Sequence, residues 1–133
     1  SSDVPISTGE SEFTRFAFRD LAELRACDIF QPDLSICGGI TEAMRIEAIA
    51  SAYQLRYAPH LWGGALTFAA GLHTMVVAST GFIVEYSLGA NPMLHELAIE
   101  DFKVIDGHLD VPERPGLGVT VNQEFVDTYR VKN

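Results

Sequence analysis

The sequence has few basic residues. Nine of its 133 residues are Lys or Arg, against 18 Asp or Glu, so the formal net charge is −9 at pH 7. Proteins bind nucleic acids and anionic membrane surfaces through Lys and Arg side chains that neutralise phosphates, and the basic residues here are scattered. The composition therefore argues against a nucleic acid or a membrane surface as a partner.

The sequence also lacks long hydrophobic runs and has almost no cysteine. No stretch of about 18 apolar residues occurs, so no segment is expected to span a bilayer, and the N-terminal residues lack the apolar core of a signal peptide. Cys27 and Cys37 form no CxxC pair and have no histidine at metal-binding spacing. We expect a cytoplasmic protein with two free, buried thiols.

What the sequence does contain is an alternation of short apolar runs and longer amphipathic ones. The 47% hydrophobic and 20% charged composition, at a length near that of one domain, indicates a compact globule. The expected elements are four strands, at 4–7, 28–31, 55–58 and 82–86, and three helices, at about 11–24, 41–53 and 65–78. Ser11 and Thr41 are the expected N-caps of the first two helices. This alternation is typical of an α/β protein with a parallel sheet.

The pattern changes in the last third of the chain. Asp106-Gly107 separates two short β-type runs, which predicts a two-residue hairpin because Asp and Gly tolerate the positive φ angles of a type I′ turn. The expected elements are hairpin strands at 102–105 and 108–111, a Pro- and Gly-rich loop at 112–118 and a short helix at 123–129. We therefore expect four β/α units in residues 1–88 and a C-terminal extension in residues 89–133.

Each expected strand ends at an ionisable residue, and these residues are Glu10, Asp33, His60 and Glu85. A right-handed β/α circuit returns the chain to the same edge of the sheet, so residues that recur at this interval converge at one end. Two interpretations stay open: ordinary polar strand ends beside solvated loops, or a functional cluster. Asp33 and His60 form the sharper pair, because a carboxylate beside an imidazole fixes its tautomer and makes it a general base.

Five short motifs, taken together in their order and intervals, resemble the enolase superfamily. They lie at 5–10, 31–43, 58–63, 84–86 and 106–118. The sequence is similar to the C-terminal half of the barrel domain in the mandelate racemase subgroup of the mandelate racemase/muconate lactonizing enzyme family. The resemblance implies the C-terminal half of a TIM-type (β/α) barrel, followed by a hairpin and tail that pack on a capping domain.

The resemblance also implies a Mg²⁺-dependent lyase or isomerase, in which the α-proton of a small carboxylate substrate, expected to be a sugar acid, is removed to form an enediolate. Glu10 matches one of three metal carboxylates. Asp33 and His60 match a dyad in which the histidine moves the proton and the aspartate orients it. Glu85 matches an acid that hydrogen-bonds the substrate carboxylate in its protonated form. Trp62 either lines the substrate pocket or covers the barrel mouth.

Several parts of such an enzyme have no counterpart in the sequence. These are the other two metal carboxylates, the strand with a lysine base for the opposite face, and the N-terminal capping domain. One carboxylate cannot hold Mg²⁺ usefully, because hard cations need several oxygen ligands. We therefore expect an inactive fragment of an enzyme that catalyses dehydration, cycloisomerisation or racemisation.

The alternative is a free-standing half-barrel module that forms a homodimer and has a binding or structural role. A half-barrel leaves two strand edges unpaired and an apolar face in water, which proteins avoid. We therefore expect these edges to be covered, either by self-association or by a missing N-terminal half.

Overall fold

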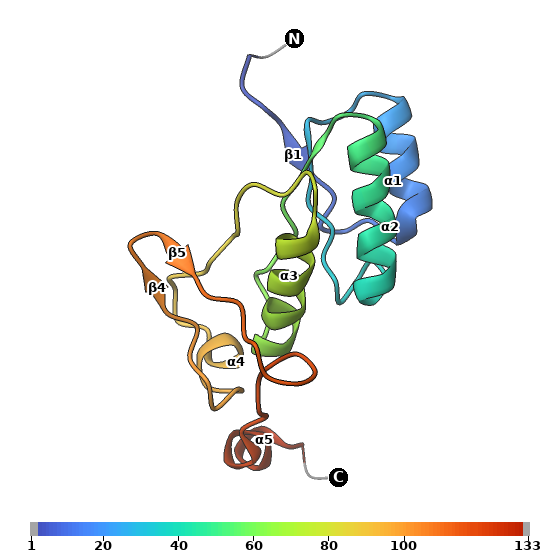
Figure 1. The fold of residues 1–133 in the computed structure, drawn as a ribbon. Coiled ribbons are helices and arrows are strands. Elements are labelled where there is room, and N and C mark those ends of the chain that lie inside the picture. The colour runs from blue at the N-terminus through green and yellow to red at the C-terminus, as the bar shows by residue number, and fades with distance from the viewer. Residues whose placement is uncertain (1–2, 132–133) are drawn as a thin grey trace.

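The computed structural model describes residues 3–131, and a small parallel sheet lies at its centre. The strands are β1 (Ser7–Thr8), β2 (Ile29–Phe30) and β3 (Arg56–Tyr57), and the helices that follow them in turn are α1 (Thr14–Glu23), α2 (Gly39–Ala52) and α3 (Ala65–Val77). The spatial order β1-β2-β3 is the order along the chain, and both pairings are parallel (Figure 1). The expected alternation of strands and helices is confirmed for these three units.

The structure does not form the expected strand at 82–86. Within the described residues, this region joins the sheet through one isolated parallel bridge, Tyr57 with Gly81, beside which the Tyr57 amide donates to the Thr80 carbonyl at 3.0 Å. Phe82 and Ile83 are exposed. Neither side chain belongs to the two buried apolar clusters, so little apolar burial favours a longer ladder here.

The two expected N-caps are also wrong. Helix α1 begins after Phe13, whose side chain makes no cap hydrogen bond, rather than after Ser11. Helix α2 begins after Gly38, three residues before the position that a Thr41 cap requires. Gly38 has φ 117°, a conformation that favours glycine, so the Gly-rich loop turns directly into the helix.

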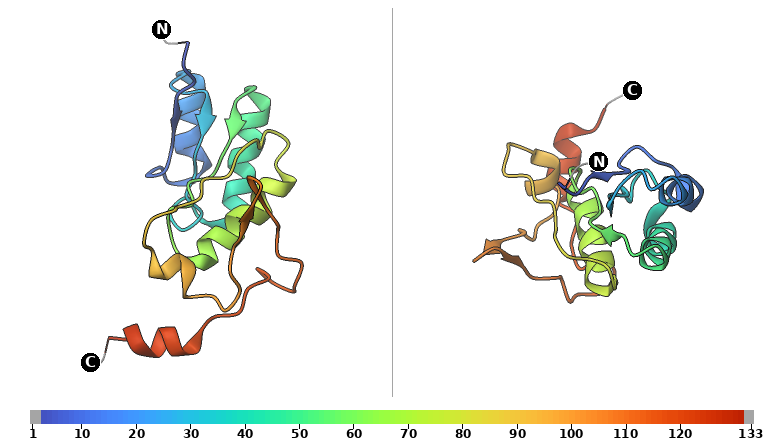
Figure 2. Two further views of the ribbon diagram at one scale, coloured as in Figure 1. Left: turned by 90° about the vertical axis from the view of Figure 1, so that its left-hand side faces the viewer. Right: turned by 90° about the horizontal axis from the view of Figure 1, so that it is seen from above.

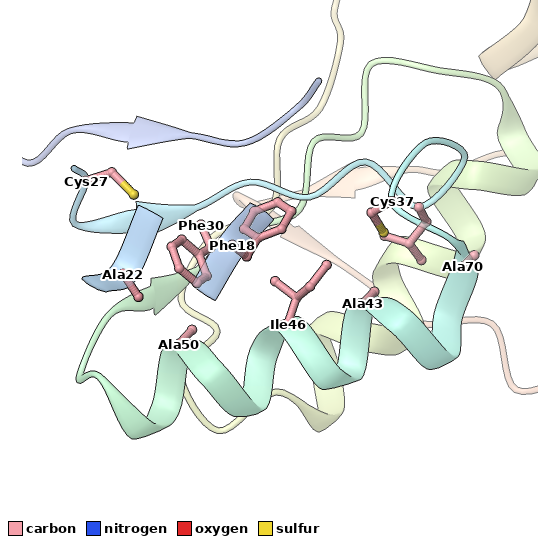
Figure 3. Packing of buried hydrophobic residues seen from close by; sticks show 10 residues of the cluster. Phe18, Ala22, Cys27, Phe30, Cys37, Ala43, Ile46, Ala50 and Ala70 are labelled. Atoms are coloured by element: carbon pink, nitrogen blue, oxygen red, sulfur yellow. The ribbon is translucent and has the colours of Figure 1, made fainter. Parts of the chain in front are cut away.

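Helices α1 and α2 lie side by side and cover one face of the sheet (Figure 1). Phe18 of α1, Phe30 of β2 and Ile46 of α2 are fully buried together, and the two phenyl rings meet edge to face with centroids 5.0 Å apart (Figure 3). Burial of such side chains contributes roughly 1.5–3 kcal/mol each. Cys27 and Cys37 belong to the same core as free thiols, which confirms the expectation for the cysteines.

The C-terminal extension packs mainly on α3, which lies between the α1–α2 pair and the hairpin (Figure 2). Its elements are α4 (Pro92–His95), β4 (Val104–Ile105), β5 (His108–Leu109) and α5 (Gln123–Tyr129). Asp106 and Gly107 have φ 50° and 76°, which confirms the type I′ hairpin. None of the described helices is long and apolar enough to cross a membrane.

Candidate active site

Asp33 and His60 meet just beyond the carboxyl ends of the neighbouring strands β2 and β3. The two residues form a parallel bridge, and the His60 amide donates to the Pro32 carbonyl at 3.1 Å. This pairing brings His60 Nδ1 to 2.9 Å from Asp33 Oδ2. The structure therefore brings together the two residues that the strand interval predicted to be neighbours.

Asp33 is held by a second set of donors. The Ser35 hydroxyl and the Ser35 amide donate to Asp33 Oδ1, at 2.5 Å and 2.7 Å. Burial, with 5% of the residue exposed, acts to raise the pKa of Asp33, but the hydrogen bonds from Ser35 and His60 outweigh it, so the pKa lies below its usual value. Asp33 is therefore an anion at neutral pH, with one oxygen turned to each partner.

Glu10 lies on the other side of the histidine ring. Its Oε2 is 3.3 Å from His60 Nε2, while the Glu10 side chain remains 65% exposed. Gly9 directs the chain to this position: its φ is 127°, and a Cβ there would lie 2.5 Å from the Phe18 ring. The two ring nitrogens of His60 thus face two carboxylates from different strands.

Glu85 reaches the same end of the sheet although no strand forms around it. Its Oε2 accepts a hydrogen bond of 2.8 Å from the Leu61 amide, directly after His60. All four ionisable residues therefore converge, as the interval predicted. Trp62 lies in the adjoining loop and is 68% exposed.

The residues of this chain do not form a metal site by themselves. Within residues 3–131, no group of three or more His, Cys, Asp or Glu side chains could hold a metal ion. Asp33 is already engaged by Ser35 and His60, and Glu10 Oε2 lies 3.3 Å from His60 Nε2. A polar hollow of about 390 Å³ opens beside Glu10, lined by residues 7–12 and Gln31.

The other three histidines take part in packing or surface contacts outside this cluster. His73 Nε2 lies 3.2 Å from the Leu117 carbonyl oxygen, and the His95 ring meets Tyr86 edge to face. His108 is exposed in the hairpin.

Ser35 and the Leu61 amide were not expected at the site. The Asp-x-Ser order is a signal for Ser35, because aspartate often accepts hydrogen bonds from the amide two residues further along the chain. No sequence signal could have identified the Leu61 amide, since every non-proline residue has a backbone N–H.

Known proteins resemble this chain in sequence and in fold. A family model described as "Enolase C-terminal domain-like" matches residues 1–125. The chain is 40% identical over 129 residues to a D-galactonate dehydratase of Pectobacterium atrosepticum, a match that covers 92% of this chain and 34% of that protein.

Two solved structures share the fold. The 3,6-anhydro-D-galactonate cycloisomerase from Zobellia galactanivorans has 33% identity and a TM-score of 0.91, with 98% of this chain and 37% of that chain covered. An enolase from Agrobacterium radiobacter with bound Na and L-malate has 29% identity and a TM-score of 0.85, with 95% and 35% covered.

This chain thus spans about a third of the length of the relatives that it matches. Its fold neighbours are TIM-barrel domains of enolase-type enzymes, and its relatives include D-galactonate dehydratases and a 3,6-anhydro-D-galactonate cycloisomerase. Because the family model covers nearly the whole sequence, the chain belongs to the enolase C-terminal domain-like family, in the mandelate racemase/muconate lactonizing enzyme branch of the enolase superfamily.

Proposed function

We propose that this chain supplies the proton-transferring pair of an enzyme that removes the α-proton of a sugar-acid carboxylate. The observation that carries the proposal is the 2.9 Å contact between His60 Nδ1 and Asp33 Oδ2. The named substrates of the relatives, D-galactonate and 3,6-anhydro-D-galactonate, are carboxylates, and so is the L-malate bound by the Agrobacterium radiobacter enolase.

The chemistry of the pair follows from its contacts. With Nδ1–H donating to Asp33, the lone pair of His60 lies on Nε2, and the substrate must take the place of Glu10 Oε2, which lies 3.3 Å from that nitrogen. Nε2 then takes the α-proton, and the electron pair of the broken C–H bond delocalises onto the substrate carboxylate as an enediolate. The Asp33 anion stabilises the imidazolium that forms.

Enzymes of this superfamily depend on Mg²⁺, which neutralises the charge of an enediolate. This chain has one of the three expected carboxylate ligands, Glu10, and its described residues do not fit the ion alone. We therefore propose that the chain is inactive by itself. In the complete enzyme, Glu85 would hydrogen-bond the substrate carboxylate, and Trp62 would line the wall of the substrate pocket.

The working enzyme is proposed to complete the barrel around this chain. Residues 1–88 would form four β/α units, with the fourth strand paired only when a neighbour is present, and residues 89–133 would pack on a capping domain. Strand β1 pairs only with β2 in the described structure, which leaves one sheet edge for the N-terminal half of the barrel. In the alternative, a second copy of the chain covers this edge, and the homodimer has a binding or structural role.

A chimera tests the function directly. The C-terminal third of the Pectobacterium atrosepticum D-galactonate dehydratase is replaced by this chain, and exchange of the D-galactonate α-proton is followed by proton NMR in D₂O with Mg²⁺. We expect exchange in the chimera and none with the chain alone. His60→Asn should slow exchange by about 10²–10⁴-fold, the usual contribution of a positioned base.

His108→Asn is the matched control, because His108 is exposed in the hairpin and its ring contacts the Asp106 carbonyl instead of the site. It should leave the exchange rate unchanged. Undiminished exchange in the His60→Asn chimera would show that this histidine is not the base.

A further inference from the structure

The loop that follows His60 has little to hold it in place by itself. Residues 61–64 include the exposed Trp62 and two consecutive glycines, and the Gly63 amide closes a tight turn onto the Leu61 carbonyl at 2.9 Å. Glycines raise the entropy cost of holding a single backbone conformation. The direction of Trp62 must therefore be set by contacts from outside the loop.

Asn91 makes such a contact from the C-terminal extension. Its Nδ2 donates to the Gly63 carbonyl at 3.0 Å, and its Oδ1 accepts from the Leu94 amide at 3.3 Å. Asn91 is half-buried, so water competes only partly for the groups that form these two hydrogen bonds. One side chain thus starts helix α4 and also holds the loop.

Apolar packing joins the same two segments. Leu94 of α4 and Leu61 of the loop are both buried in one hydrophobic cluster. Gly64 lets the segments approach closely, since a Cβ there would lie 3.4 Å from the Met93 carbonyl oxygen. Helix α4 and the loop therefore pack as one unit, and the hydrogen bonds of Asn91 connect the two.

We propose that Asn91 is a positioning residue for the active site. Its hydrogen bond to Gly63 fixes the 61–64 turn, and with it the direction of Trp62 and of the Leu61 amide that binds Glu85. The C-terminal extension thereby sets the Trp62 side of the substrate pocket. This role rests on the proposed function, because it is there that Trp62 is assigned to the pocket wall.

The chain provides its own probe, because Trp62 is its single tryptophan. Time-resolved fluorescence anisotropy of the 133-residue chain reports the local motion of this loop, and amide hydrogen exchange reports the Gly63 turn. Asn91→Asp is the informative variant, since its carboxylate still accepts from the Leu94 amide but cannot donate to the Gly63 carbonyl. Asn91→Ser adds no charge: its hydroxyl can still accept from the Leu94 amide, but it ends one bond short of the Asn91 Nδ2 that donates to the Gly63 carbonyl.

Asn122 offers a matched control. Its Oδ1 accepts from the Phe125 amide at 3.3 Å to begin α5, and its Nδ2 donates to the Glu96 carbonyl at 3.1 Å. Asn122→Asp therefore removes an equivalent bond at the other end of α4, at its C-cap Glu96, and leaves the Asn91 bond to the Gly63 carbonyl in place. Far-UV circular dichroism confirms that each variant is folded.

In Asn91→Asp and Asn91→Ser we expect a larger amplitude of Trp62 motion and about fivefold faster exchange at Gly63, the factor for one ordinary hydrogen bond. Asn122→Asp should change neither. Unchanged Trp62 motion in both Asn91 variants, or an equal change in Asn122→Asp, would overturn the proposal. Neither readout involves catalysis, so a chimera without α-proton exchange would refute the proposed function and leave this result standing.

Discussion

Ser35→Ala should lower the free energy of unfolding at neutral pH by about 1.5–3 kcal/mol, the usual worth of a hydrogen bond to a charged group. The Ser35 hydroxyl donates to Asp33 Oδ1 at 2.5 Å, and Asp33 is almost completely buried. Ser35 itself is exposed, so water can take part of the place of the lost donor, and the loss should lie at the lower end of this range. The Ser35 amide remains as a second donor at 2.7 Å, which keeps the loss within this range.

The effect must depend on pH, because the hydroxyl stabilises the charged form of Asp33. Burial opposes this charge, but the bonds from Ser35 and His60 prevail, so the folded-state pKa is lower than the unfolded value of about 3.9. A lowered carboxyl pKa stabilises the fold above the unfolded value, and this stability is lost as the pH falls through the folded value. The difference between wild type and Ser35→Ala should therefore be largest near neutral pH and shrink below about pH 4.

Urea unfolding followed by far-UV circular dichroism, at neutral and at acid pH, measures this difference. Ser79→Ala is a matched control, because its hydroxyl donates at 2.8 Å to Oε1 of the buried Glu47, away from the site. Both variants should be less stable, but only Ser35→Ala should shift the His60 ring signals in nitrogen-15 NMR spectra. A stability loss for Ser35→Ala that is as large in acid as at neutral pH would refute the electrostatic reasoning.

Three further predictions concern the core, a buried ion pair and the sheet edge. Burial raises the pKa of the Cys37 thiol to about 11, so it should resist thiol reagents at neutral pH until urea is added, and rapid labelling of the folded chain would contradict its burial. Bonds from the Arg15 amide, and then from the Arg45 and Arg15 side chains, outweigh burial and lower the pKa of Glu42 to about 2. Glu42→Gln should therefore lower the melting temperature at neutral pH, and a difference that persists near pH 2 would count against this ion pair. Light scattering after size exclusion should give a mass above 14.5 kDa, and a stable monomer would contradict the need to cover the β1 edge.

Local sequence signals predicted the fold wherever short-range physics decides it. The Asp106-Gly107 turn formed as expected because its φ angles depend on those two residues alone. The strand at 82–86 failed because a strand requires a neighbour, and sequence periodicity does not say whether one is present. The caps at Ser11 and Thr41 failed for a related reason: loop packing and the left-handed Gly38 decided where the helices begin.

The same distinction applies to the site. The strand interval predicted the convergence of Asp33 and His60, because it follows from the parallel β/α circuit. The contacts that hold the site depend on side-chain orientation in loops, so Ser35 and Asn91 were not identified. Asn91-Pro92 is nevertheless a readable helix start, with an N-cap residue followed by proline at the first helical position.

The four strand-end residues differ in how firmly the fold holds them. Asp33 and His60 follow β2 and β3, where both side chains have partners, and the exposed fraction of the His60 side chain is 17%. Glu10 follows the outer strand β1, and Glu85 lies beyond an unformed strand, and both are exposed. Folding of this chain thus fixes the Asp33–His60 pair, whereas whatever covers the two sheet edges must fix Glu10 and Glu85. Completion of the barrel should therefore alter cation and carboxylate binding more than the tautomer of His60.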